Sequence, residues 1–277
     1  MKLANGLTEL TVKGLIVAAG RGTRLGNLTK DKPKSLLEVG NQTILQRMIN
    51  SMTDCGISEI GLVRGYLAWK FDIPSLKYFE NPNFEKNNIL HSLMCAKDFL
   101  IESANEGEPI IVTYSDIVVD TSWVEYAIKL KDDIALLCDS NWELGYVGRD
   151  KHPKTEAELV VFDDTKRLQK IGKIYSLLDK EIGLGTINVA EFIGMFYLSP
   201  NGIVKLLDTF DGLSSLLRPT DTFGRSAEFQ TSYLSDLFQF IANAGDQISV
   251  ATSTSPWFEI DTAQDLRRAD KYFSKSN

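Results

Sequence analysis

The sequence predicts an α/β fold of three layers, in which helices cover both faces of a mixed, mostly parallel central sheet. Three observations predict this fold. Strand-like and helix-like segments alternate through the first half of the chain, a hairpin pattern follows in the second half, and no linker or repeat separates the halves. We therefore expect one domain over residues 1–277, which is long for a single core but within the range of α/β domains.

In the first half, short apolar runs predict buried strands, and apolar residues at helical spacing predict the helices between them. The predicted strands cover residues 15–19, 57–63, 110–112 and 134–138. The predicted helices have apolar stripes at 44–52 and 89–99, and a third helix begins at the capping box Ser122-x-x-Glu125. This order of elements favours parallel pairing, with crossover helices on both faces of the sheet.

The second half predicts antiparallel additions to this sheet and further helices. Residues 158–162 and 167–174 flank Asp163-Asp164 as in a hairpin. The other predicted elements are a strand at 192–198, helices that begin at Ser199-Pro200 and at Thr262, and an apolar helical stripe at 233–241. Residues 211–228 are rich in Gly, Ser, Thr and Asp, which predicts a mobile loop. Whether this loop is a lid or a surface excursion stays open.

The charge balance and the cysteines exclude several classes of protein. The 30 Lys and Arg against 37 Asp and Glu give a net charge of −7, which argues against a nucleic-acid or membrane-surface partner. The three cysteines, Cys55, Cys95 and Cys138, lack paired spacing, so we expect small core residues, without a zinc motif or disulfides. No apolar run approaches the roughly 20 residues of a membrane span, and residues 1–14 lack a signal-peptide pattern. We expect a cytoplasmic protein, and a homo-oligomer stays open.

The most informative segment is a glycine-rich turn after the first predicted strand. Residues 15–36 read LIVAAGRGTRLGNLTKDKPKSL. A Walker A loop needs a Gly-Lys pair before Ser or Thr, and a dinucleotide-binding fingerprint needs a glycine where Leu25 stands. Both templates therefore fail, and a glycine turn followed by an arginine and a Pro-Lys pair remains.

These residue types suit the binding of phosphate groups. Glycines let backbone N–H groups approach phosphate oxygens without a Cβ in the way. The expected backbone contacts come from Ala18, Ala19, Gly20 and Gly22. Arg24 can clamp outgoing phosphates with its guanidinium fork, and Lys34, presented by the stiff Pro33, adds a point charge near the reacting phosphate. A strand and turn with incidental basic residues is the alternative.

This segment resembles the signature of pyrophosphorylase-type nucleotidyltransferases, which share a GT-A-like fold and couple a nucleoside triphosphate to a phosphate substrate. Further resemblance lies at 60–66, 80–93, 110–116, 190–198 and 257–269. It implies Mg²⁺ as cofactor, a nucleotide-binding half at 15–140 and an acceptor-binding half at 141–277, after an N-terminal extension at 1–13. The chain departs from the family's pattern at this extension and at 145–190, which leaves the acceptor open.

Two aspartates at strand ends resemble the family's metal positions. Asp116 follows the strand at 110–112, and ligands of open α/β sheets bind at the carboxyl ends of strands. Asp261 ends the run Trp-Phe-Glu-Ile-Asp, and carboxylate oxygens are preferred ligands of Mg²⁺. Asp120 is the alternative to Asp116, a helix cap is the alternative role of Asp261, and Glu259 could support the metal or bind it directly. A phosphate or phosphonate acceptor is already mostly ionised, so no protein nucleophile is needed.

The segment 80–93 resembles the branch of the family that contains choline-phosphate and aminoethylphosphonate cytidylyltransferases. Asn88 and Ser92 lie one helical turn apart, so they can read the edge of a pyrimidine together, and Tyr66 could wall the base. A helix N-cap is the alternative role of the Asn87-Asn88 pair. His91 lies beside this motif, and neither it nor His152 is assigned a role.

For the acceptor, Glu191 resembles the family's substrate-contacting glutamate. Asp139 and Trp142 follow another strand end, where a carboxylate and an aromatic face would suit an ammonium group, although Trp142 could serve packing alone. The sequence thus predicts transfer of CMP from CTP to a small phosphonate or phosphocholine-like acceptor, with release of pyrophosphate.

Three alternatives stay open beside this prediction. One is a sugar-1-phosphate nucleotidyltransferase that uses UTP or dTTP. Another is an inactive, nucleotide-binding regulatory subunit, against which the joint presence of Arg24, Lys34, Asp116 and Asp261 counts. The last is a glycosyltransferase, which would be expected to hold its metal with an Asp-x-Asp motif that Asp116-Ile117-Val118 does not provide.

Overall fold

The computed structural model describes residues 11–176 and 188–274. Its central sheet has nine strands, and one half of it is parallel. In that half, β5 (Leu76–Glu80), β4 (Ile60–Arg64), β1 (Lys13–Ala18) and β6 (Ile110–Tyr114) lie side by side in this order. The predicted parallel strands therefore exist, and they bring the chain segments that follow β1 and β6 to the same edge of the sheet.

The other half of the sheet is built around a long antiparallel strand. Its members are β8 (Ile134–Asp139), β9 (Leu159–Phe162), β10 (Leu168–Gly172), β11 (Asn188–Leu198) and β12 (Ser249–Ser253). Strand β11 runs antiparallel to β6, β8 and β9, β10 runs antiparallel to β9, and β12 is parallel to β8. All nine strands therefore point one way except β10 and β11, so the predicted mixed, mostly parallel sheet is confirmed.

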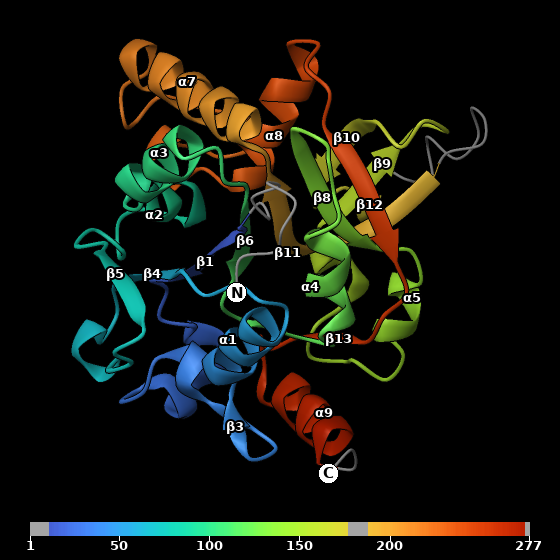
Figure 1. The fold of residues 1–277 in the computed structure, drawn as a ribbon. Coiled ribbons are helices and arrows are strands. Elements are labelled where there is room, and N and C mark those ends of the chain that lie inside the picture. The colour runs from blue at the N-terminus through green and yellow to red at the C-terminus, as the bar shows by residue number, and fades with distance from the viewer. Residues whose placement is uncertain (1–10, 177–187, 275–277) are drawn as a thin grey trace, which may run out of the picture.

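Helices cover both faces of the sheet (Figure 1). The helices are α1 (Ile44–Asp54), α2 (Ile89–Met94), α3 (Lys97–Asn105), α4 (Ser122–Ala127), α5 (Trp142–Gly145), α7 (Pro200–Leu216), α8 (Leu234–Asn243) and α9 (Ala263–Phe273). Alternate residues of β1 enter opposite cores: Leu15 packs with residues of α2, α3, α7 and α8, and Ile16 packs with residues of α1 and α4. The predicted three layers follow from this alternation.

Two short ribbons lie beside the main sheet. Strands β2 (Glu38–Val39) and β3 (Gln42–Thr43) form one of them, ahead of α1. Strands β7 (Ile117–Val119) and β13 (Trp257–Glu259) form the other, and they pair in antiparallel register. This second ribbon brings a C-terminal segment against the end of β6, where the Ile260 N–H donates to the Asp116 carbonyl at 2.8 Å.

Three local predictions are wrong. The predicted loop at 211–228 begins only after Leu216, because α7 continues with Leu213 buried against the core. The predicted helix at 89–99 is divided into α2 and α3. The predicted capping box of α4 is absent, because the Asp120 carboxylate accepts from the Ser122 N–H at 3.0 Å in its place.

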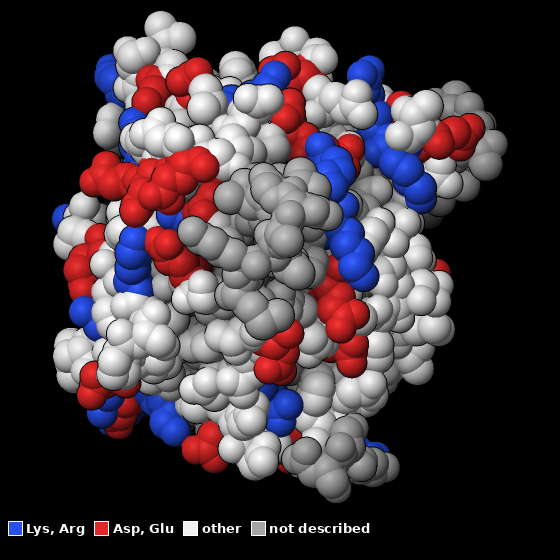
Figure 2. All heavy atoms as spheres, in the orientation of Figure 1, with Lys and Arg blue, Asp and Glu red and all other residues white. Residues whose placement is uncertain are grey.

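Several other predictions are confirmed. The hairpin β9–β10 forms, the Ser199 hydroxyl caps α7 ahead of Pro200, and the three cysteines are free. Among the described residues no helix is long and apolar enough to cross a membrane. On the described part of the face in Figure 2, acidic and basic groups are interspersed without a continuous basic surface. The first ten residues of the predicted N-terminal extension, and residues 177–187 of the divergent region 145–190, lie outside the described residues.

Candidate active site

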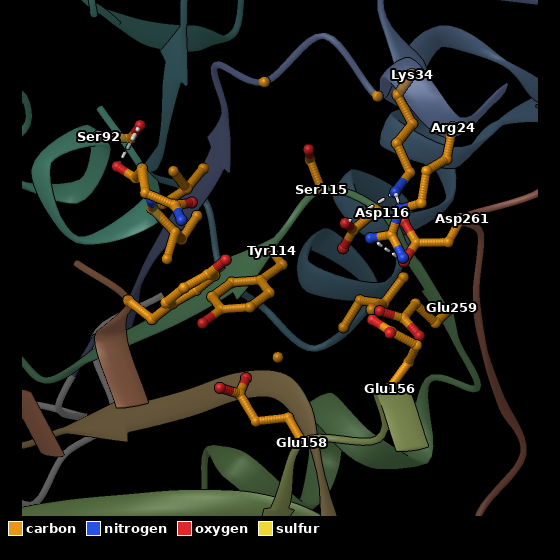
Figure 3. Close-up of a pocket in the computed structure, with 18 of the residues that line it drawn as sticks. Arg24, Lys34, Ser92, Tyr114, Ser115, Asp116, Glu156, Glu158, Glu259 and Asp261 are labelled. Carbon is orange, nitrogen blue, oxygen red and sulfur yellow. Dashed lines mark hydrogen bonds and ion pairs between the residues drawn. The ribbon is translucent and has the colours of Figure 1, made fainter. Parts of the chain in front are cut away.

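A cavity of about 360 Å³ opens at the carboxyl ends of β1 and β6 (Figure 3). Most of the predicted nucleotide, metal and catalytic residues line it, together with groups that the sequence analysis did not single out. Its polar and glycine lining includes Gly20, Gly22, Arg24, Lys34, Asn87, Asn88, Ser92, Tyr114, Asp116, His152, Glu156, Glu158, Lys173, Glu191, Glu259 and Asp261. One cavity thus joins residues from both halves of the chain.

At one end of the cavity, two basic side chains meet two carboxylates. Lys34 Nζ lies 3.0 Å from Asp116 Oδ2 and 2.5 Å from Asp261 Oδ1. Arg24 Nη2 lies 2.6 Å from the other oxygen of Asp261. Figure 3 shows the four side chains pointing toward one another. The structure therefore brings Lys34, Asp116 and Asp261 together, and their catalytic and metal-binding roles stay predictions.

The local backbone explains why Lys34 reaches this position. Gly22 has φ +69°, a left-handed conformation that favours glycine, and a Cβ at that residue would lie 2.9 Å from Lys34 carbon atoms. Pro33 precedes the short helical turn Lys34–Leu36, in which the lysine side chain is buried. The lysine stem therefore packs directly on the glycine turn, which fixes where its ammonium group lies.

The charges of this centre stabilise one another. Burial by itself lowers the pKa of Lys34, but the carboxylates of Asp116 and Asp261 outweigh burial and raise the pKa above its ordinary value. Burial acts in the opposite sense on Asp261, and Lys34 and Arg24 lower the pKa of that carboxyl group below its ordinary value. At neutral pH the lysine is therefore cationic and the aspartate anionic.

Asp116 and Asp261 fit the requirements of a magnesium site. Asp116 Oδ1 is buried and has no hydrogen-bond partner within the described part of the chain, so it is a free carboxylate ligand of the kind that hard cations take. The alternative ligand, Asp120, is exposed and caps α4. Asp261 is not a helix cap, because Thr262 holds that position in a reciprocal capping box with Asp265. The structure thus places Asp116 and Asp261 in the cavity lining, and Asp120 is not among the lining residues.

A buried layer behind Asp261 was missed by the sequence analysis. His152 is 2% exposed, and its Nε2 lies 3.4 Å from Glu259 Oε2. Arg149 Nε lies 2.8 Å from Asp265 Oδ1. Desolvation and the neighbouring carboxylates of Asp261 and Asp116 raise the pKa of Glu259 well above its ordinary value. A single histidine carries no motif, so only the three-dimensional arrangement identifies this layer.

At the opposite end, α2 begins at the predicted base-binding residues. Asn88 Oδ1 accepts from the Ile89 N–H at 2.8 Å, so the helix-cap role is present, and its Nδ2 donates to the Thr231 carbonyl at 3.3 Å. Ser92 Oγ accepts from Asn81 Nδ2 at 2.9 Å. These hydrogen bonds fix the orientation of both predicted side chains at the cavity wall.

Two predicted nucleotide-binding residues do not line this cavity: Ala18, which is buried at the end of β1, and Tyr66. The Tyr66 hydroxyl donates to the Thr29 carbonyl at 3.0 Å, and its ring packs edge-on against Phe84, which does line the cavity. The aromatic wall next to the predicted base position is therefore Phe84, and Tyr66 supports it from behind.

Between the two ends lie acidic side chains and one lysine from the second half of the chain. Glu191 is 3% exposed, and burial raises the pKa of its carboxyl group to about 8 although the Tyr146 hydroxyl donates to it at 2.5 Å. Burial also raises the pKa of Glu158. Lys173 Nζ lies 2.5 Å from Glu156 Oε2. Glu156, Glu158 and Lys173 flank the hairpin β9–β10, and no local pattern marks them as residues of a site.

Asp139 and Trp142 line a neighbouring cavity of about 280 Å³. Glu191, Trp257 and Glu259 line both cavities, so the two share a wall. Trp142 is buried, and the Trp257 indole N–H donates to Asp139 Oδ2 at 3.0 Å. Of the three predicted acceptor residues, the main cavity therefore contains Glu191 alone.

Comparison with known proteins gives the family. Residues 14–177 match the model of the MobA-like NTP transferase domain. The chain is 29% identical over 262 residues to CTP:phosphoglutamine cytidylyltransferase from Campylobacter jejuni, an alignment that covers 92% of this chain and 98% of the relative. It is 26% identical over 178 residues to 2-aminoethylphosphonate cytidylyltransferase from Lancefieldella rimae, over 62% of this chain and 65% of that one.

A solved structure gives the same fold. The CTP:phosphocholine cytidylyltransferase from Streptococcus pneumoniae superposes with a TM-score of 0.66 at 18% identity, over 95% of this chain and 99% of that one. The family model covers more than half of the sequence, and the fold agrees with it. The protein belongs to the MobA-like NTP transferase family and is a nucleotidyltransferase.

Proposed function

We propose that this nucleotidyltransferase moves CMP from CTP to a small phosphorylated or phosphonate acceptor that carries an ammonium group, and releases pyrophosphate. The observation that carries the proposal is the distribution of charge in the main cavity. Two of its cations, Arg24 and Lys34, meet at the carboxylates predicted to bind the metal. The other acidic groups, which include Glu158 and Glu191, line the rest of the cavity. This distribution of charge would give a triphosphate and a cationic acceptor separate places.

The triphosphate would lie against the glycine turn. The backbone from Ala19 to Gly22 follows β1, and a side chain at Gly20 would meet no atom within 4 Å, which leaves its backbone open to phosphate oxygens. Arg24, whose side chain is 55% exposed, can leave Asp261 for the outgoing phosphates at small cost. Lys34 stays buried and supplies charge near the α-phosphate.

Asp116 and Asp261 would hold Mg²⁺, which when bound neutralises charge on the triphosphate and makes pyrophosphate a better leaving group. The acceptor supplies the nucleophile. One of its phosphate or phosphonate oxygens forms the new bond to the α-phosphorus, and the bond from that phosphorus to the bridging oxygen breaks. The chain's own residues position the reactants and place positive charge where negative charge develops.

The acceptor would lie at the acidic part of the cavity. Among its described lining residues the cations are Arg24, Lys34 and Lys173, and the carboxylates are Asp116, Glu156, Glu158, Glu191, Glu259 and Asp261. Burial raises the pKa of Glu158 and Glu191, and an ammonium group beside them would favour their ionised forms. The acidic lining therefore favours an acceptor with an ammonium group over a purely anionic one. Lys173 would contact the acceptor's phosphate or phosphonate. The relatives named for phosphoglutamine and 2-aminoethylphosphonate support this class of acceptor.

CTP is favoured because the two relatives described above are cytidylyltransferases and because Asn88 and Ser92 present amide and hydroxyl groups beside Phe84. The test is a panel of CTP, UTP, dTTP and ATP with Mg²⁺, each combined with phosphoglutamine, 2-aminoethylphosphonate, phosphocholine or glucose 1-phosphate, with pyrophosphate release as the readout. We expect release with CTP and an ammonium-bearing acceptor. Release with UTP or dTTP and glucose 1-phosphate would establish the sugar-phosphate alternative, and no release from any pair would contradict the proposal.

A further inference from the structure

His152 lies buried in the wall of the main cavity and has an unpaired ring nitrogen. Its Nδ1 is 3.7 Å from Asp265 Oδ2 and 3.8 Å from Asp261 Oδ2, and it makes no hydrogen bond within the described residues. The opposite ring nitrogen is 3.4 Å from Glu259 Oε2. A buried polar atom without a partner costs free energy, so its retention beside two carboxylates calls for a ligand.

We propose that His152, Glu259 and Asp261 form a second divalent-cation site, which prefers Mn²⁺ to Mg²⁺. Each residue offers one ligand atom, and these atoms all lie within 4.8 Å of one another. Side-chain rotation can bring such a set to coordination distance, because His nitrogen and carboxylate oxygens bind first-row metals at about 2.0–2.2 Å. All three residues also line the cavity, which gives a cation a path to them.

The neighbouring carboxylate Asp265 is not part of this set. Its Oδ2 accepts from the Thr262 N–H and from the Thr262 hydroxyl, both at 2.8 Å, and thereby caps α9. Its Oδ1 accepts from Arg149 Nε at 2.8 Å. Asp265 and Arg149 therefore form a rigid support behind the site, and Glu259, which is only partly buried, remains free to rotate toward a cation.

Asp261 connects this site to the pair Asp116–Asp261. Its Oδ1 faces Lys34 and its Oδ2 faces Arg24 and His152. A carboxylate with its two oxygens directed to different groups can bridge two cations, as in two-metal sites. The donor sets differ, however: two carboxylates suit Mg²⁺, and one imidazole with two carboxylates suits a transition ion such as Mn²⁺.

The test measures metal binding without nucleotide, so its outcome is independent of the proposed reaction. Untagged protein is freed of metal with a chelator and titrated with Mn²⁺, and free Mn²⁺ is followed by EPR. The bound ion is then examined by ESEEM, which detects a coordinated imidazole nitrogen. We expect a bound Mn²⁺ with nitrogen modulation that excess Mg²⁺ does not displace. Protein grown with ¹⁵N-histidine should show the corresponding change in modulation.

The chain has only two histidines, which provides a matched control. His152→Gln should abolish the nitrogen modulation and weaken binding of that ion by about 10- to 100-fold or more. His91→Gln should retain both, because His91 packs edge-on against the rings of Phe210 and Phe229. Glu259→Gln should weaken the same ion without removing the modulation at saturating Mn²⁺. Wild-type protein without nitrogen modulation, or unchanged modulation in a folded His152→Gln variant, would overturn the proposal.

Discussion

Lys34 Nζ and Asp261 Oδ1 lie 2.5 Å apart, although 227 positions of the chain separate the two residues. The glycine turn after β1 places the lysine, and the ribbon of β7 and β13 places the aspartate. The contact therefore forms only when both ends of the chain have folded onto the same edge of the sheet. The following predictions test what this centre does.

Replacing Lys34 should remove most of the activity. In Lys34→Ala we expect the turnover number to fall roughly 100- to 1,000-fold, because a buried cation next to the reacting phosphate is lost. The matched control is Lys32→Ala, since Lys32 is exposed and lies two positions away. Steady-state pyrophosphate release and circular dichroism check both variants. Equal turnover in the two would remove Lys34 from the catalytic centre.

Replacing Asp116 should change the demand for metal. Asp116→Asn is expected to raise the Mg²⁺ concentration needed for half-maximal activity and to lower the maximal rate, since a neutral amide is a poorer ligand than a carboxylate. Asp120→Asn should leave both quantities near wild type, because asparagine caps a helix as well as aspartate does. Titration of activity with Mg²⁺ distinguishes them. The assignment is wrong if the second variant, rather than the first, shows the altered metal demand.

The two glycines of the turn should respond differently to a methyl group. Gly22→Ala places a Cβ 2.9 Å from Lys34 at a φ of +69°, so we expect a loss of about 1–2 kcal/mol in unfolding free energy and a lower turnover number. Gly20→Ala meets no atom within 4 Å and should keep its stability, but the methyl group projects toward the nucleotide and should raise the KM for CTP. Denaturant unfolding and initial rates give both comparisons. Similar stability in the two variants would contradict this account of the turn.

Glu191 should make stability depend on pH. Its pKa is about 8 in the folded chain and close to 4.5 when unfolded, so the folded state binds the extra proton between these values. The unfolding free energy should therefore fall as pH rises from about 5 to 9. Glu191→Gln mimics the protonated group and should flatten this decline. Guanidinium titrations at several pH values test it, and an equal slope in both proteins would show that Glu191 titrates normally.

Strands β1, β4 and β6 of the parallel half could be predicted because they are short apolar runs, as in Leu15 to Ala18. Strands β5 and β12 were missed, since Lys77, Thr252 and their neighbours interrupt the apolar pattern. The ribbon of β7 and β13 could not be predicted either, because its pairing joins segments more than a hundred positions apart. Composition also gave a wrong prediction at 211–216. The serines and the glycine there predict a loop, but packing of α7 against the core keeps this segment helical.

The site residues differ in the same way: some stand in a local motif, and others are brought to the site only by tertiary structure. Arg24, Lys34 and Asp116 could be found because each stands in a recognisable segment. Glu158 and His152 carry no local pattern, and only tertiary packing brings them to the cavity. The sequence also could not decide between two roles of Asn88, because the side chain that could bind a base also caps α2.

The most direct test of the central claim is ³¹P NMR of the products that form from CTP and an acceptor labelled with ¹⁸O in its phosphonate group, in the presence of Mg²⁺. The account predicts pyrophosphate and a product in which a labelled oxygen bridges the acceptor phosphorus and the α-phosphorus of CTP. Label bonded to the β- or γ-phosphorus, or nucleotide cleavage that leaves the acceptor unchanged, would contradict nucleotidyl transfer at the Lys34–Asp116–Asp261 centre.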